Sequence, residues 1–345
     1  MKRIVVALSL CFCLAVTLLL PGCGNTLTRY QYTYLDVFDT ATTLVVYAPS
    51  QSRADEWAKA LHARLSEFHR LYTIYESEAG LNNLKTVNDS AGTPVAVDEE
   101  IVSLLKLGKE AHTLTGGKVN IAMGSVLSLW HQARTDGIDH PETAALPERS
   151  ALQKAKQHTD INTLTIDETA LTVELSDPES KLDVGAIAKG FAAREVAAFA
   201  KKLGISSALI SVGGNVVAVG GRPDNTPFVI GIEDPSGEQS YLFTVKVRDL
   251  TVVTSGNYQR YYTVDGVRYH HLIDPDTLYP AEYMTSVSVI GPDSGLADAL
   301  STALFLLPPE EGKALIKKVA GYEAVWILKD GSRLYSDNFE QYTTS

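Results

Sequence analysis

Cysteine is nearly absent from this chain of 345 residues: its three cysteines, Cys11, Cys13 and Cys23, all lie near the N-terminus. If that segment is removed by processing, the folded body has no disulfide and no thiol chemistry. The chain also lacks an excess of basic residues, since its formal net charge is -11. No basic stripe offsets this charge, so nucleic acid is not expected as a partner.

The N-terminus carries a processing signal rather than part of the fold. The apolar stretch Ile4–Leu20 follows Lys2 and Arg3; it is short for a transmembrane helix and typical of a signal sequence. It ends in Leu-Pro-Gly-Cys, which resembles a lipobox, the signal for diacylation of a cysteine. The alternative is a plain secretory signal with a chance cysteine.

We therefore expect residues 1–22 to be a lipoprotein signal peptide and Cys23 to carry the lipid. Residues 23–29 would form the tether of a protein anchored in the membrane on its extracytoplasmic face. Loss of Lys2 and Arg3 would change the net charge from -11 to -13.

The rest of the chain, residues 30–345, has the composition of a soluble globular protein. Hydrophobic residues make up 45% and charged residues 21% of the whole sequence, which excludes a disordered chain. The length allows one large domain or two packed lobes. Strand and helix patterns follow one another in mixed order, which favours an α+β or mixed α/β fold over a clean doubly wound sheet.

Apolar periodicity and turn residues predict the elements of this domain. We expect helices over residues 54–75, 125–134, 148–157, 186–203, 295–307 and 310–319. A further helix is expected to begin after a cap at Asp98 and to end before Gly116. We expect strands over 30–47 with an interruption at 38–40, over 171–175, 208–219 as a pair, 228–232, 242–247, 251–254 and 286–290, and a hairpin over 324–334. Residues 135–146 are polar and irregular, and predict a surface loop.

The predicted helix 295–307 is almost entirely apolar but contains Asp298 and Thr302. Residues four apart lie on the same face of a helix, one turn apart. A carboxylate in such surroundings is costly unless it is paired or bound to a metal. One carboxylate and one hydroxyl are part of the oxygen shell that Mg²⁺ accepts when phosphates and waters complete it. The structural alternative is that Asp298 caps the helix and Thr302 bonds back to the backbone.

Two further segments contain residues suited to an anionic ligand. In Asp183–Gly190, glycines permit close backbone approach at a helix start, and Lys189 stands in the first turn, where the helix dipole does not favour a cation. A plain strand-to-helix turn is the alternative. His270 and His271 are adjacent, so at most one of them faces a given site. A histidine there could act as a general base, although for either residue taken singly a surface or structural role is favoured.

Four stretches, in this order, resemble the ApbE family, the FAD:protein FMN transferases. They are DVGAIAKG at 183–190, SVGGN at 211–215, TSG at 254–256 with HHLIDP at 270–275, and ADALSTA at 297–303. Weaker blocks at 38–40, at Tyr75 with 81–88 and at 117–130 also match. The resemblance covers nearly all of the chain after the leader and implies one large α+β catalytic domain, with FAD in a cleft between two α/β halves.

The resemblance also implies roles for individual residues. Asp298, Thr302 and the backbone carbonyl of Ala186 would bind Mg²⁺, and His271 would lie closest to the reacting phosphate. The residues implied to contact FAD are Phe38, Tyr75, Ala122, Met123, Gly124, Asp183, Lys189 and Leu272.

The activity implied is transfer of FMN from FAD to a threonine or serine hydroxyl, with release of AMP. The implied acceptors are flavin-bearing subunits of membrane redox complexes. Two alternatives stay open: an FAD pyrophosphatase that gives FMN and AMP, and a flavin-binding lipoprotein without activity.

The sequence departs from the family pattern at two positions. Asp39 stands where relatives often have glycine, and Leu278 stands where the family usually has glycine. Because glycine permits a positive φ, either Leu278 adopts that strained conformation or the turn differs.

Overall fold

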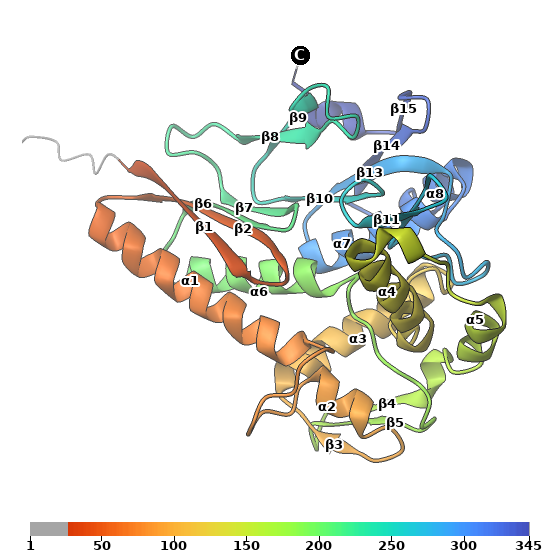
Figure 1. Cartoon of the computed structure of the whole chain (residues 1–345). Coiled ribbons are helices and arrows are strands. Elements are labelled where there is room, and N and C mark those ends of the chain that lie inside the picture. The colour runs from red at the N-terminus through yellow and green to blue at the C-terminus, as the bar shows by residue number, and fades with distance from the viewer. Residues whose placement is uncertain (1–26, 345) are drawn as a thin grey trace, which may run out of the picture.

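The computed structural model describes residues 27–344, so the predicted signal peptide and Cys23 lie outside the described residues. An antiparallel sheet of eight strands forms the centre of the molecule (Figure 1). Its strands, in spatial order, are β1 (Thr28–Val37), β2 (Thr40–Ala48), β6 (Ser207–Val212), β7 (Asn215–Gly220), β10 (Thr251–Gly256), β13 (Met284–Gly291), β14 (Glu323–Leu328) and β15 (Arg333–Tyr335).

Helices cover one face of this sheet, and a β-hairpin covers the other. The helices that pack on the sheet are α1 (Gln51–Tyr72), α6 (Ala188–Lys202), α7 (Ser294–Leu306) and α8 (Pro309–Ile316), and α3 (Glu99–Leu114) packs on α1 and α7. The hairpin consists of β8 (Phe228–Glu233) and β9 (Tyr241–Val247), and it shares a hydrophobic cluster with β10, β13 and β14. Helices gathered on one side of an antiparallel sheet are the α+β arrangement that the sequence predicted.

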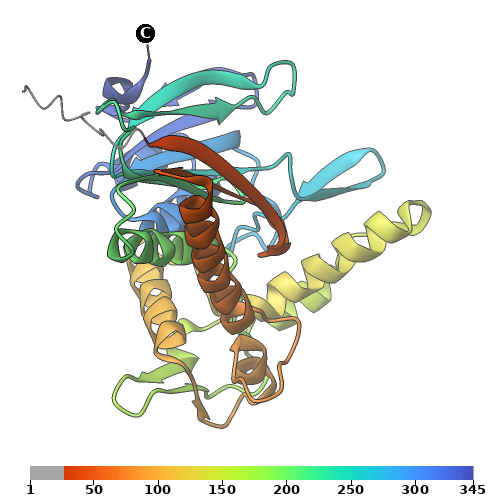
Figure 2. The same ribbon diagram turned by 90° about the vertical axis from the view of Figure 1, so that its left-hand side faces the viewer.

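A second group of elements lies beyond the helices, on the side away from the sheet (Figure 1). It contains α2 (Leu84–Asp89), α4 (Gly124–Asp139), α5 (Arg149–Lys156) and a small sheet of β3 (Val95–Ala96), β5 (Thr172–Leu175) and β4 (Leu164–Asp167). The hairpin of β11 (Tyr261–Val264) and β12 (Val267–His270) projects from the same side of the molecule as α4 (Figure 2). Short 3₁₀ turns at Pro141–Thr143, Ile161–Thr163 and Phe339–Tyr342 complete the chain.

Helix α7 is the most deeply buried helix of the fold. All of its residues except Leu296 are buried, because it packs against α3, α6 and α8 and against β10 and β13 of the central sheet. A helix surrounded in this way has no need of a polar face, which explains its apolar sequence. Among the described residues, no helix has both the length and the apolar character needed to cross a membrane.

Several predicted boundaries are wrong, and tertiary contacts explain the largest error. Helix α4 runs to Asp139, so residues 135–139 do not form the expected loop. At Gly137 an added Cβ would lie 2.6 Å from the Tyr262 ring, so the helix packs closely against β11 over polar residues that gave no apolar signal. Helix α1 ends at Tyr72 rather than at 75, and α6 begins at Ala188 rather than at 186. The sequence analysis did not predict α2, β3, β4 or the full hairpin β11–β12.

Leu278 adopts a backbone conformation with positive φ, which is ordinarily glycine's. Its φ is 66°, and its side chain is 1% exposed among Val126, Trp130 and their neighbours. The indole N–H of Trp130 donates to the Leu278 carbonyl at 2.9 Å. The burial of the leucine side chain therefore offsets the strain of the left-handed backbone.

We expect Leu278→Gly to be more stable than Leu278→Ala by roughly 0.5–1 kcal/mol, although both should be less stable than the parent chain. Both variants lose the buried side chain, but only alanine keeps the strain of a positive φ. Urea unfolding followed by circular dichroism measures the difference. An alanine variant as stable as the glycine variant would show that this backbone carries no strain.

Candidate active site

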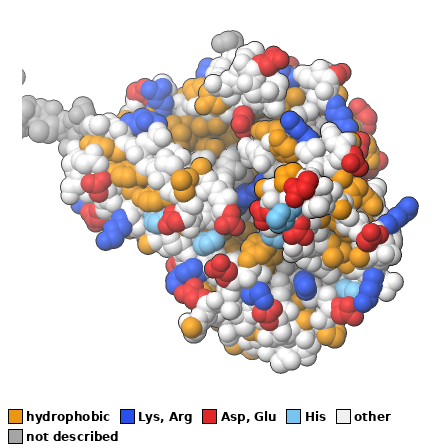
Figure 3. All heavy atoms as spheres, in the orientation of Figure 1, with side chains coloured by type: hydrophobic (Ala, Val, Ile, Leu, Met, Phe, Trp, Pro, Cys, Tyr) orange, Lys and Arg blue, Asp and Glu red, His pale blue; other side chains and the backbone are white. Residues whose placement is uncertain are grey.

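A cavity of about 210 Å³ opens between the central sheet and α4, and it collects most of the predicted site residues. Figure 3 shows this face of the molecule hollowed at that place. A smaller compartment of about 120 Å³ adjoins it beneath the β1–β2 hairpin. Tyr75, Asp183, Gly185, Lys189 and Arg260 line both compartments.

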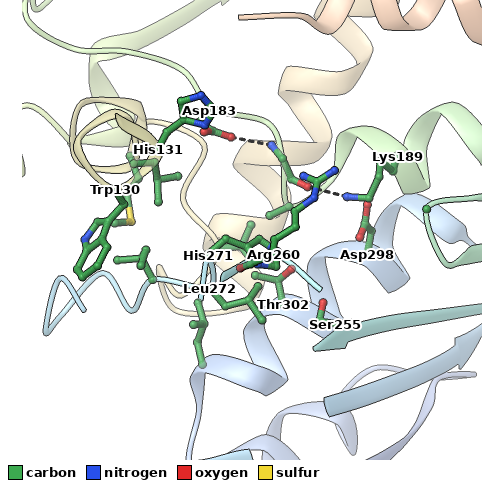
Figure 4. A pocket seen from close by; sticks show the side chains of 18 of the residues that line it. Trp130, His131, Asp183, Lys189, Ser255, Arg260, His271, Leu272, Asp298 and Thr302 are labelled. Atoms are coloured by element: carbon green, nitrogen blue, oxygen red, sulfur yellow. Dashed lines mark hydrogen bonds between the residues drawn. The ribbon is translucent and has the colours of Figure 1, made fainter. Parts of the chain in front are cut away.

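Asp298 and Thr302 both line the main compartment from α7 (Figure 4). The structural alternatives for this pair are wrong. Asp293 caps α7, because its side chain accepts from the N–H of Leu296 at 2.9 Å. The hydroxyl that bonds back to the Asp298 carbonyl belongs to Ser301, at 2.9 Å, and within residues 27–344 the Thr302 hydroxyl makes no hydrogen bond. Its oxygen is therefore free to bind a ligand in the cavity.

The start of α6 meets α7 at Gly190. An added Cβ there would lie 2.2 Å from the Ser294 carbonyl oxygen and 2.6 Å from the Asp298 Cβ, so only glycine permits this approach. The Gly190 N–H donates to Asp298 Oδ2 at 2.8 Å. It does not donate to the Ala186 carbonyl, four residues earlier, and we find no other donor to that carbonyl among the described residues. Ala186 lines the same compartment as Asp298 and Thr302.

The donors present fit a hard divalent cation. They are a carboxylate, a hydroxyl and a backbone carbonyl, all of them oxygens, which Mg²⁺ prefers. Burial raises the pKa of Asp298, and the nearby Lys189 only partly offsets this effect, so the carboxylate lacks compensating positive charge. Residues 27–344 contain no group of three or more histidine, cysteine or acidic residues placed to hold a metal. A bound cation would therefore need further oxygens from substrate and water.

Asp183 and Lys189 lie on opposite sides of Gly185. Asp183 accepts from the Gly185 N–H at 2.8 Å, and the Lys189 ammonium donates to the Gly185 carbonyl at 3.3 Å (Figure 4). Burial raises the pKa of Asp183. Within the described chain no carboxylate lies within 4.0 Å of the Lys189 nitrogen, so its charge is available to an anion in the cavity.

The two adjacent histidines point to different surroundings. His270 is buried, packs against the Phe305 ring and shares a 2.9 Å hydrogen bond with the Ala281 carbonyl. His271 lines the main compartment, and its Nδ1 lies 3.3 Å from the Arg260 carbonyl. Because a carbonyl only accepts, Nδ1 carries the proton and Nε2 keeps its lone pair. Burial, helped by the positive charge of Arg260, lowers the pKa of His271 to about 3, so the ring is neutral near pH 7.

The two aromatic residues expected to contact FAD, Tyr75 and Phe38, line the outer walls of the compartments. Tyr75 is 53% exposed and stacks on the His131 ring with a centroid distance of 4.8 Å. Phe38 lines the smaller compartment from the tip of the β1–β2 hairpin. Phe38 and Asp39 both have positive φ, 57° and 50°, as a tight type I′ turn requires, although neither is glycine. The Phe38 N–H donates to His69 Nδ1 at 3.1 Å, which helps to hold this turn.

Of the remaining residues expected to contact FAD, two line the cavity and two lie behind its wall. Met123 and Leu272 line the main compartment. Ala122 is fully buried, and Gly124 begins α4 with its N–H donating to the Lys181 carbonyl at 2.9 Å; neither lines a compartment.

Sequence analysis missed His131 and Arg134, which line the cavity from α4. The Arg134 guanidinium donates to His131 Nδ1 at 3.0 Å. These residues lie three apart on a polar helix face, and nothing in that pattern distinguishes them from a solvated surface. Arg260 also lines the cavity, and no pattern in the sequence assigned it a role.

Comparison with known proteins places this geometry in a family. Residues 38–326 match the ApbE family model. The FAD:protein FMN transferase of Treponema pallidum is 36% identical over 293 residues, covering 79% of this chain and 79% of that protein. The FAD:protein FMN transferase of Klebsiella pneumoniae is 30% identical over 282 residues, covering 81% and 84%.

Solved structures agree with the sequence comparisons. The ApbE protein of Thermotoga maritima is similar with a TM-score of 0.81 at 29% identity, covering 92% of this chain and 100% of that chain. The flavin transferase ApbE of Vibrio cholerae gives a TM-score of 0.77 at 25% identity, covering 91% and 100%. The family model, the relatives and the fold all agree with the motifs in the sequence, and this chain belongs to the ApbE family.

Proposed function

We propose that this protein transfers FMN from FAD to a threonine or serine hydroxyl of an acceptor protein and releases AMP. The relatives named FAD:protein FMN transferase support the flavin transfer. The observation that carries the proposal is local. The Asp298 carboxylate, which accepts one hydrogen bond from Gly190, the Thr302 hydroxyl, the Ala186 carbonyl and a neutral histidine with a free lone pair all line one cavity.

Asp298, Thr302 and the Ala186 carbonyl would hold Mg²⁺. When bound, Mg²⁺ supplies Lewis acidity that offsets the charge of the phosphates and favours departure of AMP. Its own charge also explains how a protein of net charge -11 can bind an anionic dinucleotide.

The residues of the cavity divide the work of the transfer. Lys189 neutralises phosphate charge, while Asp183, Met123 and Leu272, with Tyr75 and Phe38 at the outer wall, hold the dinucleotide. His271 Nε2 takes the proton of the acceptor hydroxyl. The hydroxyl oxygen then forms a bond to the FMN phosphorus, and the bond between that phosphorus and the bridging oxygen breaks. Its electron pair leaves with AMP, and FMN becomes a phosphoester on the acceptor.

The protein would perform this reaction outside the cytoplasm, anchored through a lipid on Cys23. The motif at residues 20–23 supports this location. The acceptors would be flavin-bearing subunits of membrane redox complexes, whose target hydroxyl must reach the open side of the cavity.

The central experiment incubates the purified protein with FAD, Mg²⁺ and an apo acceptor subunit. We expect mass spectrometry to show the acceptor heavier by one FMN, and Asp298→Ala and Thr302→Val to lose this product by at least about 100-fold because the metal donors are gone. Asp293→Asn, which weakens the α7 cap without lining the cavity, is the matched control and should keep its dependence on Mg²⁺. Free FMN and AMP with an unmodified acceptor would identify a hydrolase instead, and full activity of Asp298→Ala would refute the metal site.

His271→Gln should lower the rate of transfer by roughly 100- to 10,000-fold, the usual contribution of a general base. His140→Gln, at an exposed histidine that lines neither compartment, is the control and should leave the rate unchanged.

The pH profile gives a second readout for His271. A pKa lowered to about 3 keeps Nε2 unprotonated through the mildly acidic range. Protonation blocks the base, so kcat/KM should stay level from pH 7 to about pH 5 and fall only below that. A fall centred near the ordinary histidine pKa of about 6.5 that is absent from the residual activity of His271→Gln would contradict this assignment.

We expect Cys23→Ser to move the protein from the membrane fraction to the soluble fraction of cells, because the hydroxyl cannot receive the diacylglyceryl group. Fractionation followed by immunoblotting measures the distribution. A variant that stays in the membrane fraction would show that the apolar leader, rather than the lipid, holds the protein there.

A further inference from the structure

Two cations, Lys189 and Arg260, line both compartments of the site. They approach the junction from different elements: Lys189 from the first turn of α6, and Arg260 from the segment before β11. Figure 4 shows Arg260 between the Asp183 side of the cavity and the side formed by Asp298 and Thr302. The resemblance to the family gave a role to Lys189 but none to Arg260.

Most N–H donors of the Arg260 guanidinium have no partner among the described residues. Among the described residues, no carboxylate lies within 4.0 Å of its guanidinium, and its one hydrogen bond is a long contact of 3.4 Å to the Asp39 carbonyl. A guanidinium has five N–H donors, so most of them are open to a ligand. By contrast, the ion-paired arginines of the described residues line neither compartment.

The surroundings of Arg260 also favour an anion. Arg134 lines the same cavity and has no carboxylate partner in residues 27–344. Burial and the charge of Arg260 lower the pKa of Arg134, which reports repulsion between the two guanidinium groups. An anion between Arg260, Arg134 and Lys189 would relieve that repulsion.

The shape of the substrate locates this anion. A flavin dinucleotide has two ring systems joined through a pyrophosphate, so a molecule that occupies both compartments must pass its pyrophosphate through the junction. Arg260 and Lys189 are the two cations that line the junction from both compartments. The planar fork of an arginine matches two phosphate oxygens at once.

We propose that Arg260 binds the pyrophosphate of FAD at the junction of the two compartments, together with Lys189. This inference rests on the proposed function, since it takes FAD as the ligand. Arg260 then has two tasks: its backbone carbonyl fixes the tautomer of His271, and its side chain selects a phosphorylated flavin. The competing interpretation is that Arg260 lies at the edge of the cavity, contacts only water and does not bind the ligand.

The test measures binding by the full chain, without turnover. FAD and riboflavin are titrated in EDTA, and again with Mg²⁺ in the absence of acceptor, with flavin fluorescence as the signal. We expect Arg260→Gln to weaken FAD binding roughly 10- to 100-fold, as for loss of charged hydrogen bonds, and to leave riboflavin binding unchanged because riboflavin has no phosphate. Arg260→Lys should recover part of the loss, since it keeps the charge without the fork.

The matched control is Arg268→Gln. Arg268 lies nearby on β12, where its guanidinium rests over the Tyr261 ring at 4.6 Å, and it does not line the cavity. FAD binding that is unchanged in Arg260→Gln, or a loss equal for FAD and riboflavin, would overturn the inference and leave the proposed function intact. A parent chain that binds FAD under neither condition would overturn both.

Discussion

The contact between α6 and α7 at Gly190 is the constraint on which the site depends. The N–H of Gly190 and the carboxylate of Asp298 meet at 2.8 Å only because residue 190 has no side chain. This single bond orients the carboxylate of Asp298, removes the ordinary donor from the Ala186 carbonyl, and fixes the helix start that carries Lys189. A charge-assisted bond in a buried setting is strong, and the cost of breaking it includes an unsatisfied carboxylate.

The fold makes that contact possible by burying α7 from every side. The helix packs against the antiparallel sheet and against α3, α6 and α8, so it is held firmly where it lines the cavity. The outer walls are built differently, from the β1–β2 turn, α4 and the loop after β12. Rigid oxygen donors therefore lie inside, and larger aromatic and basic side chains lie outside, where a substrate enters.

Much of this was predictable from sequence because the signals are local. The Asp98 cap, the break in the strand pattern at residues 38–40 and the Asp298–Thr302 spacing follow from caps, strand alternation and helical periodicity. The structure has the cap and the spacing, and the break is the turn between β1 and β2. The extension of α4 and the positions of His131 and Arg134 follow instead from packing against β11, between residues more than 100 positions apart. The tautomer of His271 depends on a neighbour eleven residues away, whose backbone position only the folded chain defines.

The β1–β2 hairpin links the beginning of the described chain to the cavity. Strand β1 starts at Thr28, and its turn places Phe38 in the wall of the smaller compartment. Ten residues of strand extend roughly 30 Å. If Cys23 carries the proposed lipid, β1 separates the tether from the wall of the smaller compartment by roughly 30 Å, which affects how far from the bilayer a target hydroxyl can lie. A hydroxyl on a short membrane-proximal loop and one on a domain far from the bilayer would then differ in accessibility for reasons of geometry alone.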